Sequence, residues 1–310
     1  MTAWHALPRP RLAAVVGDVL WNGPIDHDAP TDADQVIRTQ VRSVRRIDLI
    51  GLAGGVGCSH VAARLAVLLA HRRGGRVLGV DAGLGDGFTR LTHAAAPPKP
   101  AAPATGRTDR HTTPTAGAIR AEAATARLSV GLAALRVGRV EAPGQTAARP
   151  QDWQPSVGEV ARFFDVVVTD WGHRLPGIDF QESLGGAHAV ALVCRAERAA
   201  VDSAVSVAAA VAGQVPCLVC AVDVDGVGGL APRLANRWTQ VPVVHVPFMG
   251  DPDQAIAPAP VRRAVIGLAE ALMSLATAPA FPAVDDPAVP RAHEPSARRA
   301  LAARSGGESP

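Results

Sequence analysis

The sequence predicts an α/β protein: a mostly parallel sheet with helices on both faces. From residue 47 onward, short runs that are apolar throughout alternate with stretches in which apolar residues recur at helical spacing. A strand that is apolar on both sides is covered on both sides, and alternation with helices is typical of parallel sheets. With 310 residues, of which 48% are apolar and 19% charged, the chain can bury one large core or two smaller ones.

The expected elements follow one another along the chain. We expect strands at 47–52, 77–80, 166–169, 189–194, 217–222 and 243–246, with regular structure also resuming over 128–137. Helices are expected at 59–72 and 199–211, and another begins at Pro260, where a first helical turn tolerates proline. A capping box at Ser156–Glu159 predicts a short helix that ends near Phe164.

Three segments lack this pattern. Residues 1–46 hold an acidic patch followed by arginines, and we expect a largely extended N-terminal arm. Residues 94–125 have Ile119 as their only large aliphatic residue and gather Pro, Thr and Ala, which predicts a flexible insertion. Residues 277–310 return to Pro, Ala and Arg and are expected to be a disordered tail. The folded domain is therefore expected to span 47–276.

The composition excludes several chemistries. Of 31 basic residues one is a lysine, Lys99, and the chain has no tyrosine, so mechanisms that need a lysine ligand or a tyrosine nucleophile are disfavoured. The net charge of +3, carried by arginine, does not by itself indicate nucleic acid. The four cysteines are too few and too scattered for a disulfide framework. Without an apolar run of 18 residues or a signal-like start, we expect a cytoplasmic protein with no transmembrane segment.

The most informative segment is residues 50–60, which read Ile-Gly-Leu-Ala-Gly-Gly-Val-Gly-Cys-Ser-His. A strand runs into a glycine loop, and the loop opens a helix. Glycines let the backbone approach an anion, and the start of a helix offers free N–H groups, so this geometry is a phosphate cradle. A normal phosphate loop adds a lysine and a Ser/Thr hydroxyl. Ser59 supplies the hydroxyl, whereas Cys58 stands at the lysine position. A tight turn that binds nothing is the alternative.

These residues resemble the MinD/ParA-like division of P-loop ATPases. The loop of that family reads Lys-Gly-Gly-Val-Gly-Lys-Thr-Thr, where residues 53–60 read Ala-Gly-Gly-Val-Gly-Cys-Ser-His, so both family lysines are missing. Residues 77–83 resemble the following motif, with the first carboxylate kept as Asp81 and the second replaced by Gly83. Residues 164–172 resemble the Walker B strand, with Asp170 at the Mg²⁺ position. In all, residues 47–276 follow the family order.

The resemblance implies ATP or ADP with Mg²⁺ as the ligand, bound weakly or not at all. It implies nucleotide contacts from Gly54, Gly55, Val56, Gly57, Cys58, Ser59 and Pro247. Ser59, Asp81 and Asp170 would hold the Mg²⁺, and Asp81 and Asp170 would be catalytic if ATP is hydrolysed. The asparagine that family members often use for the base is missing around 221–223. One lost lysine costs about 10- to 100-fold in affinity, and on the order of 10³-fold in phosphoryl transfer. An arginine near in sequence (Arg46, Arg64 or Arg90) is a candidate replacement.

The leading hypothesis is a degenerate MinD-like regulatory or localising adaptor for a secretion or cell-envelope machine. It would act as a homodimer or with a protein partner, such as an intact ATPase of a secretion system. Residues 36–47 resemble the MinD-like protein of actinobacterial type VII secretion, whereas the loop without lysine resembles the Tad pilus and septum-site localisation group. The alternative is a slow genuine ATPase in partitioning or positioning of a division site, chromosome or pilus. A third, weaker hypothesis is DNA binding through Arg72, Arg73 and Arg76.

Four smaller expectations concern single residues. Trp171 is expected to fill part of the nucleotide site, and Asp86 is a candidate for the missing second carboxylate. Cys58 is either a thiol of lowered pKa at a helix N-terminus or a plain small-residue replacement. Cys217 and Cys220 lie three apart on a strand and should therefore point to opposite faces, as small buried residues.

Overall fold

The computed structural model describes residues 29–278 with gaps. The described ranges are 29–73, 77–84, 87–95, 126–129, 132–137, 140–141, 144–145, 147–175, 177–226, 230–248 and 258–278. The described residues all belong to one compact unit. The predicted insertion, apart from residues 94 and 95, and the predicted tail, apart from residues 277 and 278, lie outside the described residues.

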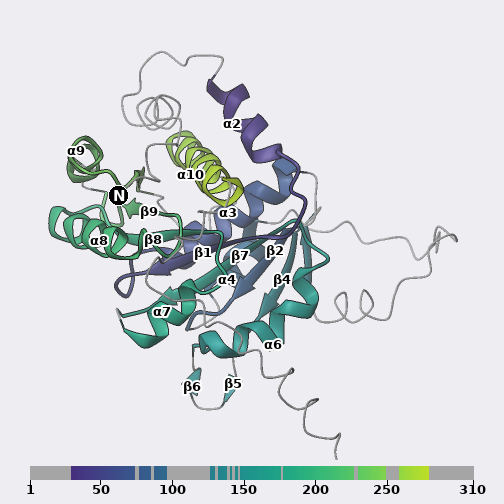
Figure 1. The fold of residues 1–310 in the computed structure, drawn as a ribbon. Coiled ribbons are helices and arrows are strands. Elements are labelled where there is room, and N and C mark those ends of the chain that lie inside the picture. The colour runs from purple at the N-terminus through teal and green to yellow at the C-terminus, as the bar shows by residue number, and fades with distance from the viewer. Residues whose placement is uncertain are drawn as a thin grey trace, which may run out of the picture. The chain divides into compact units, whose positions relative to one another are not determined.

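The core of the fold is one eight-stranded sheet, in the order β10-β9-β8-β1-β7-β2-β4-β3 (Figure 1). The strands are β1 (Arg45–Gly51), β2 (Val77–Asp81), β3 (Ala126–Ser129), β4 (Leu132–Arg136), β7 (Val166–His173), β8 (Ala189–Arg195), β9 (Cys217–Val222) and β10 (Val243–Val246). All pairings are parallel except that of β3 with β4. The predicted mostly parallel sheet is therefore confirmed. A separate hairpin joins β5 (Val140–Glu141) and β6 (Gly144–Gln145).

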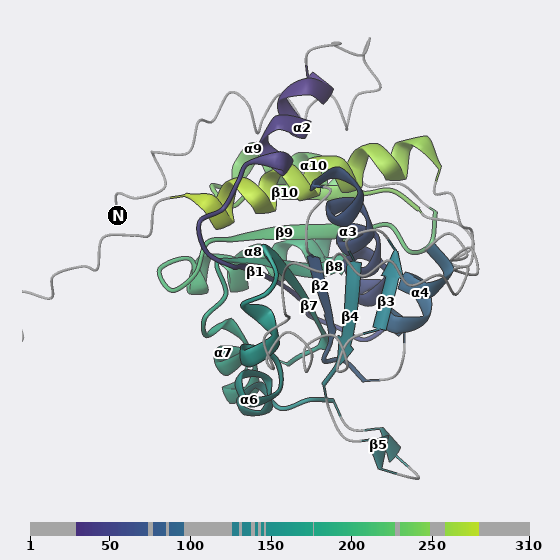
Figure 2. The same ribbon diagram turned by 90° about the vertical axis from the view of Figure 1, so that its right-hand side faces the viewer.

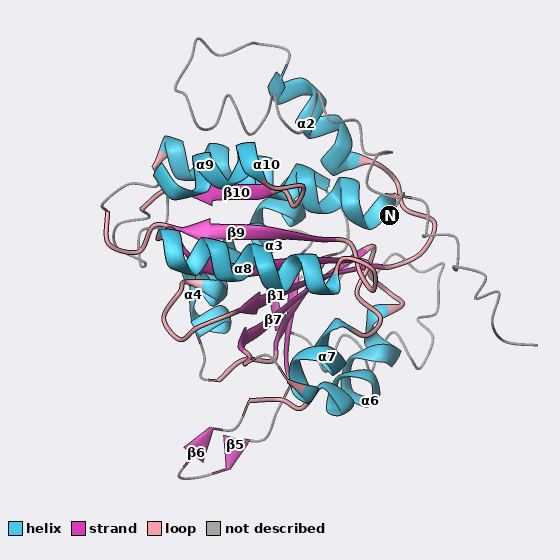
Figure 3. Cartoon of the chain, turned by 60° about the vertical axis from the view of Figure 1, so that its left-hand side comes forward, coloured by secondary structure: helices cyan, strands magenta, loops and turns pink. Residues whose placement is uncertain are grey.

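Helices cover both faces of the sheet (Figures 2 and 3). On one face lie α2 (Ala29–Arg38), α3 (Cys58–Arg73), α4 (Gly87–Ala95) and α10 (Ala259–Thr277). On the other lie α6 (Pro150–Ala161), α7 (Ile178–Leu184), α8 (Arg198–Val211) and α9 (Leu230–Trp238). The two faces hold separate apolar clusters, and every residue of β9 is buried. Cys217 belongs to one cluster and Cys220 to the other, which confirms that they point to opposite faces.

One helix start was predicted wrongly. The helix expected to begin with the capping box at Ser156 is α6, and it begins at Pro150. Ser156 lies inside this helix and is exposed. Proline has a backbone preset for the first helical turn, and Trp153 and Val157, four apart, are both buried against the sheet. Burial of that apolar stripe outweighs the capping signal. The short helices α4, α7 and α9 had no sequence prediction.

Residues 29–38, predicted as part of an extended arm, form the helix α2. Ala33 and Ile37 bury its inner side against α3 and α10. Arg73 of α3 donates from Nη1 to the carbonyl oxygens of Ile37, at 2.6 Å, and Thr39, at 3.0 Å. Carbonyl groups at the end of a helix lack partners within the helix, so a cation there stabilises that end.

Candidate functional site

The glycine loop between β1 and α3 has the geometry of an anion cradle. Gly55 and Gly57 have φ values of 70° and 83°, a conformation that glycine adopts without steric cost. A Cβ added at Gly54 or Gly55 would meet nothing within 4 Å, so this side of the loop is open. Within the described residues, the amides of Gly54, Gly55 and Gly57 donate to no backbone carbonyl. These N–H groups and the N-terminus of α3 are therefore free to bind an anion.

Cys58 lies at the start of α3 and is 6% exposed. Its Sγ donates a hydrogen bond to Oδ1 of Asp170 over 3.3 Å. Burial raises the pKa of the Cys58 thiol well above its usual range, and the neighbouring Asp170 raises it further. The interpretation of Cys58 as a thiol of lowered pKa is thus wrong. The side chain at the lysine position is a neutral donor to a carboxylate of the protein.

The two predicted carboxylates lie side by side at the end of the sheet. β2 and β7 pair in parallel, and Asp81 is opposite Asp170 in the register. Oδ2 of Asp81 accepts hydrogen bonds from the Thr89 hydroxyl, at 2.9 Å, and the Thr89 amide, at 3.4 Å. Burial raises the pKa of Asp81, Thr89 opposes this shift, and the charge of Asp170 adds to it. The structure thus brings the two carboxylates together on neighbouring strands, with Asp170 in contact with the start of α3.

Asp170 is fully buried and only half satisfied. Its Oδ1 accepts from the Gly172 amide, at 2.9 Å, and from Cys58. Its Oδ2 is buried, and none of the described residues donates a hydrogen bond to it within the usual distance and angle. Burial raises the pKa of Asp170, opposed by the Ser59 hydroxyl, the Gly172 amide, the Cys58 thiol and, last, the charge of Arg174. A buried acceptor without a partner costs free energy, so this oxygen marks a place for a missing donor or cation.

These oxygens fit a magnesium ion. Mg²⁺ is usually bound by one or two carboxylates together with substrate phosphates and water. Asp170, Asp81 and the Ser59 hydroxyl provide such a donor set beside the loop, and a cation there would favour the ionised form of both carboxyls. No cluster of three His, Cys, Asp or Glu side chains that would hold a metal ion without other donors occurs in the described part of the chain.

The turn that follows β2 is in close contact with the last residues of β7. Gly172 has a φ of 63°, and a Cβ added there would lie 3.1 Å from Cα of Gly83. A Cβ at Gly83, the position of the family's second carboxylate, would lie 3.4 Å from Cα of Gly172 and 3.8 Å from Oδ2 of Asp170. Asp86, the candidate for replacing that carboxylate, lies outside the described residues.

Sequence reasoning missed Arg174, which follows β7 directly. Its amide donates to the Gly51 carbonyl, at 2.9 Å, and its Nη2 to the carbonyls of Ala82, at 3.1 Å, and Ala148, at 2.8 Å. It thus joins the start of the glycine loop, the turn after β2 and the start of α6. Its charge also lowers the pKa of Asp170. A single arginine just beyond a buried apolar strand was the available signal.

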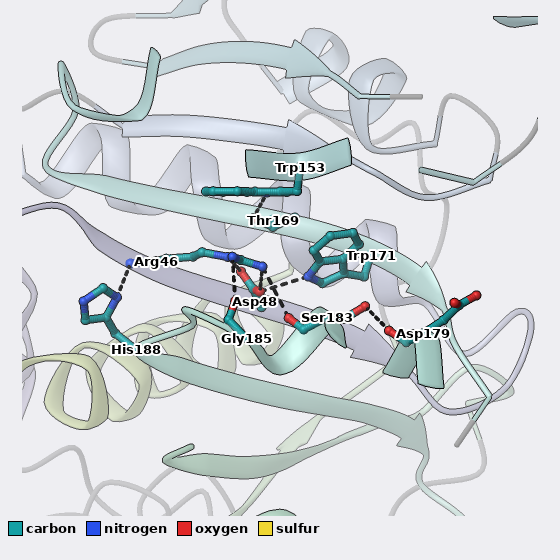
Figure 4. A network of polar contacts seen from close by, with 9 residues as sticks. All are labelled: Arg46, Asp48, Trp153, Thr169, Trp171, Asp179, Ser183, Gly185 and His188. Atoms are coloured by element: carbon teal, nitrogen blue, oxygen red, sulfur yellow. Dashed lines mark hydrogen bonds and ion pairs between the residues drawn. The ribbon is translucent and has the colours of Figure 1, made fainter. Parts of the chain in front are cut away.

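The arginines considered as lysine replacements are differently placed. Arg46 is buried on the face of the sheet opposite α3, where it pairs with Asp48. Arg90 is exposed on α4, and Arg64 is partly buried within α3. Trp171 is likewise on the face opposite the loop: it is fully buried, and its Nε1 donates to Oδ2 of Asp48 over 2.9 Å (Figure 4). The expectation that Trp171 fills the nucleotide site is wrong, because neighbouring strand residues alternate between faces.

The ends of β9 and β10 complete the site on the other side of the loop. A Cβ at Gly57 would lie 3.4 Å from Val222, and the Asp223 amide donates to the carbonyl of Val246 over 2.9 Å. Pro247, partly exposed, follows directly after β10. At the position of the missing asparagine, Asp223 accepts from the amide of Gly226 at 2.8 Å and so shapes its own loop.

The sheet order, the glycine loop and the paired carboxylates together define the class: the chain has the fold of MinD/ParA-like P-loop NTPases. Solved structures with this fold include the septum site-determining protein MinD of Pyrococcus horikoshii complexed with Mg-ADP, with 18% identity and a TM-score of 0.52, covering 73% of this chain and 94% of that one. They also include a ParA family ATPase of Chlorobium tepidum, with 13% identity, a TM-score of 0.52 and coverage of 74% and 98%.

The MinC:MinD cell division complex of Aquifex aeolicus is similar too, with 17% identity, a TM-score of 0.51 and coverage of 77% and 98%. No protein-family model matches the chain, and no curated protein matches it by sequence. At these identities the likeness shows the fold. None of the described helices is both long enough and apolar enough to span a bilayer.

Proposed function

We propose that this chain is a degenerate MinD/ParA-like nucleotide-binding protein, a pseudo-ATPase that binds ATP or ADP with Mg²⁺ weakly and does not hydrolyse ATP efficiently. One observation carries the proposal: an open glycine cradle lies beside a buried carboxylate oxygen without a partner, while Cys58 stands where a lysine would neutralise phosphate. The site keeps what binds a phosphate and its metal, and lacks the cation that stabilises transferred charge.

Each residue of the proposed site has one task. The amides of Gly54, Gly55 and Gly57 would bind phosphate oxygens. Ser59, Asp81 and Asp170 would hold the Mg²⁺, which neutralises phosphate charge when it is bound. Pro247 would lie against the base, as the resemblance implies. Val56 is buried under the loop and so supports its shape.

The cellular role we propose is that of a regulatory or localising adaptor for a secretion or cell-envelope machine, as a homodimer or with a protein partner. The similarity to a MinD solved in complex with MinC supports a protein partner. The residues that precede β1 favour the type VII secretion group, and the loop without lysine favours the pilus and septum-site group. In either setting, the partner would bind one conformation of this chain. That conformation would either depend on bound nucleotide or be permanent.

Calorimetric titration of Mg-ATP and Mg-ADP into the full chain tests the proposal. We expect wild-type binding in the range of tens to hundreds of micromolar, and binding about 10- to 100-fold tighter in Cys58→Lys. Cys58→Ala is the matched control, because it removes the thiol without adding a cation, and it should not tighten binding. No binding by either wild type or Cys58→Lys would contradict a working cradle.

A slow genuine ATPase remains the second candidate, because Ser59, Asp81 and Asp170 all lie at the loop. It predicts phosphate release above background that Asp170→Ala abolishes. DNA binding is less favoured: Arg72 pairs with Asp34 at 3.1 Å, and Arg73 holds the end of α2, so these two guanidinium groups have partners within the protein. Arg76 lies outside the described residues.

A further inference from the structure

A buried polar cluster, drawn in Figure 4, lies on the face of the sheet opposite the proposed phosphate site. Its centre is Arg46, which pairs through Nε with Oδ1 of Asp48 at 2.9 Å and through Nη2 with Oδ2 at 2.6 Å. The two residues are two apart on β1 and therefore share a face. The guanidinium group lies 4.0 Å from the ring centre of Trp153. It also donates to the carbonyls of Ser183, at 3.3 Å, and Gly185, at 2.9 Å, around the end of α7.

Stability alone does not account for this cluster. The Arg46 side chain is 10% exposed and that of Asp48 is fully buried. Removing two charges from water is costly, and apolar residues of similar volume often serve stability equally well. A buried network in which every polar group is paired does, however, hold its side chains in one fixed arrangement.

The cluster reaches the phosphate site through Trp171. Oδ2 of Asp48, already paired with Arg46, also accepts the Trp171 indole N–H at 2.9 Å. In the sequence, Trp171 lies between Asp170 and Gly172. The amide of Gly172 donates a hydrogen bond to Oδ1 of Asp170. Any rotation of the backbone at Trp171 would carry both of them.

The pairing of β1 with β7 is irregular along this backbone, although β2 still pairs with β7 at Asp170. The register of β1 against β7 runs from Leu49 opposite Asp170 to Gly51 opposite His173, so β7 has one extra residue there. Residues in such a bulge lack regular ladder bonds, and bulges often occur next to functional sites, where they aim a side chain. The positive φ of Gly172 lies within the same bulge. On the β1 side, the hydrogen bond from the Trp171 side chain is therefore an added constraint on a stretch of β7 that pairs irregularly with β1.

We propose that Asp48 and Trp171 are positioning residues for Asp170: the cluster centred on Arg46 holds the indole from behind, and the indole fixes the bulge that aims the Asp170 carboxylate at the glycine loop. The proposal rests on the proposed function only in taking Asp170 as the carboxylate of a phosphate site. Under this proposal the conformation of the site depends on the hydrogen bond between Trp171 and Asp48, neither of which would contact a ligand.

Thiol alkylation tests this without any nucleotide. Cys58 reports on the site, because its thiol is bound to Asp170, and Cys217, buried at the far end of β9, reports on general opening of the same molecule. The variant is Trp171→Phe, which removes the indole N–H. Its matched control is Trp153→Phe, which removes a second buried indole N–H of the cluster, bonded to Thr169 at 3.3 Å. Rates of alkylation by iodoacetamide are measured for each cysteine by peptide mass spectrometry.

We expect Trp171→Phe to raise the rate at Cys58 at least tenfold relative to Cys217, and Trp153→Phe to leave this ratio within twofold of wild type. Asp48→Asn should behave as Trp171→Phe does; if it fails to fold, the two tryptophan variants still decide. An equal rise at both cysteines, an equal effect of the two tryptophan variants, or no rise at Cys58 would overturn the proposal. Titration of nucleotide into wild type tests the proposed function separately. The alkylation ratio tests the role of Asp48 and Trp171 whether or not wild type binds nucleotide.

Discussion

The thiol of Cys58 donates a hydrogen bond to Oδ1 of Asp170. The first residue of α3 is thus bound directly to the carboxylate that we propose as a magnesium ligand. Burial, together with the neighbouring carboxylate, raises the pKa of the thiol and keeps it neutral, and the second oxygen of Asp170 has no hydrogen-bond partner among the described residues. The first prediction concerns this bond.

Replacing Cys58 by alanine should destabilise the protein by about 1–3 kcal/mol, because a buried carboxylate loses one of its donors. The cost should grow as the pH rises through the folded-state pKa of Asp170, which burial raises, since the donor matters most when the carboxyl group is ionised. Urea unfolding over a pH series measures it. Cys217→Ala is the matched control: that buried thiol donates to the neutral carbonyl of Ala208 over 3.5 Å, so its cost should not depend on pH. A pH-independent cost in Cys58→Ala would contradict the prediction.

Replacing Asp170 by asparagine should change how stability depends on pH. Burial raises the folded-state pKa of Asp170 above its unfolded value of about 3.9. Its contribution to stability is thus fully present below the unfolded pKa and is lost as pH rises through the folded pKa. Asparagine does not titrate, so the stability of Asp170→Asn relative to wild type should rise with pH, by up to about 1.4 kcal/mol per unit between the two pKa values.

Urea unfolding from pH 4 to pH 8 checks this relationship. Asp202→Asn, at an exposed position on α8, serves as the control and should give a flat difference from wild type. A flat difference for Asp170→Asn as well would mean that the carboxyl titrates alike in the folded and unfolded chains. Added Mg²⁺ with nucleotide should reduce the difference at pH 8, because a bound cation stabilises the ionised carboxylate.

Replacing each of two neighbouring glycines by alanine should distinguish a position that needs glycine for its backbone conformation from one that only lines open space. Gly55 has a φ of 70°, so Gly55→Ala should cost about 1–2 kcal/mol of stability. Gly54→Ala should cost less than half of that, since its new methyl group has open space around it. Thermal or urea unfolding gives both numbers. If Gly54→Ala nevertheless weakens Mg-ADP binding, its methyl group lies where the phosphate would bind. Equal losses of stability in the two variants would contradict the prediction that the backbone of Gly55→Ala is strained.

The α2 helix should detach when Arg73 is replaced. Arg73→Ala removes two charge-assisted hydrogen bonds to the carbonyls of Ile37 and Thr39, and we expect faster tryptic cleavage at Arg38 and Arg42. Arg72→Ala is the control: its partly exposed pair with Asp34 should contribute less than 1 kcal/mol, with little change in cleavage. Cleavage that is equally fast in both variants would show that packing, not Arg73, holds the helix.

The sheet and the loop were predictable because their signals are local. Strands such as β9 are apolar at every position, and a loop with positive φ at Gly55 and Gly57 has to be rich in glycine. The two carboxylates were predictable for a related reason: the ends of parallel strands meet at one edge, so Asp81 and Asp170 come together once both strands are known.

The polar cluster around Arg46 was not predicted, although the sequence contains one indication of it. Asp48 is a lone carboxylate inside a buried strand, and Arg46 is two residues before it, which places both on one face. Their partners come from α6, α7 and β7, more than 100 residues away in sequence, and a single sequence does not show such pairings. Alternation along β7 places Trp171 and Asp170 on opposite faces, which is inconsistent with a place for both side chains in one nucleotide site.

The contact between Gly83 and Gly172 makes the two positions dependent on each other in evolution. Any residue other than glycine at 172 would meet both an unfavourable φ and the backbone of Gly83. A carboxylate introduced at 83 would enter beside Oδ2 of Asp170, and like charges raise the cost of ionising both. If the proposed function holds, a carboxylate at 83 would therefore be tolerated better after a cation has been introduced at 58 than before it.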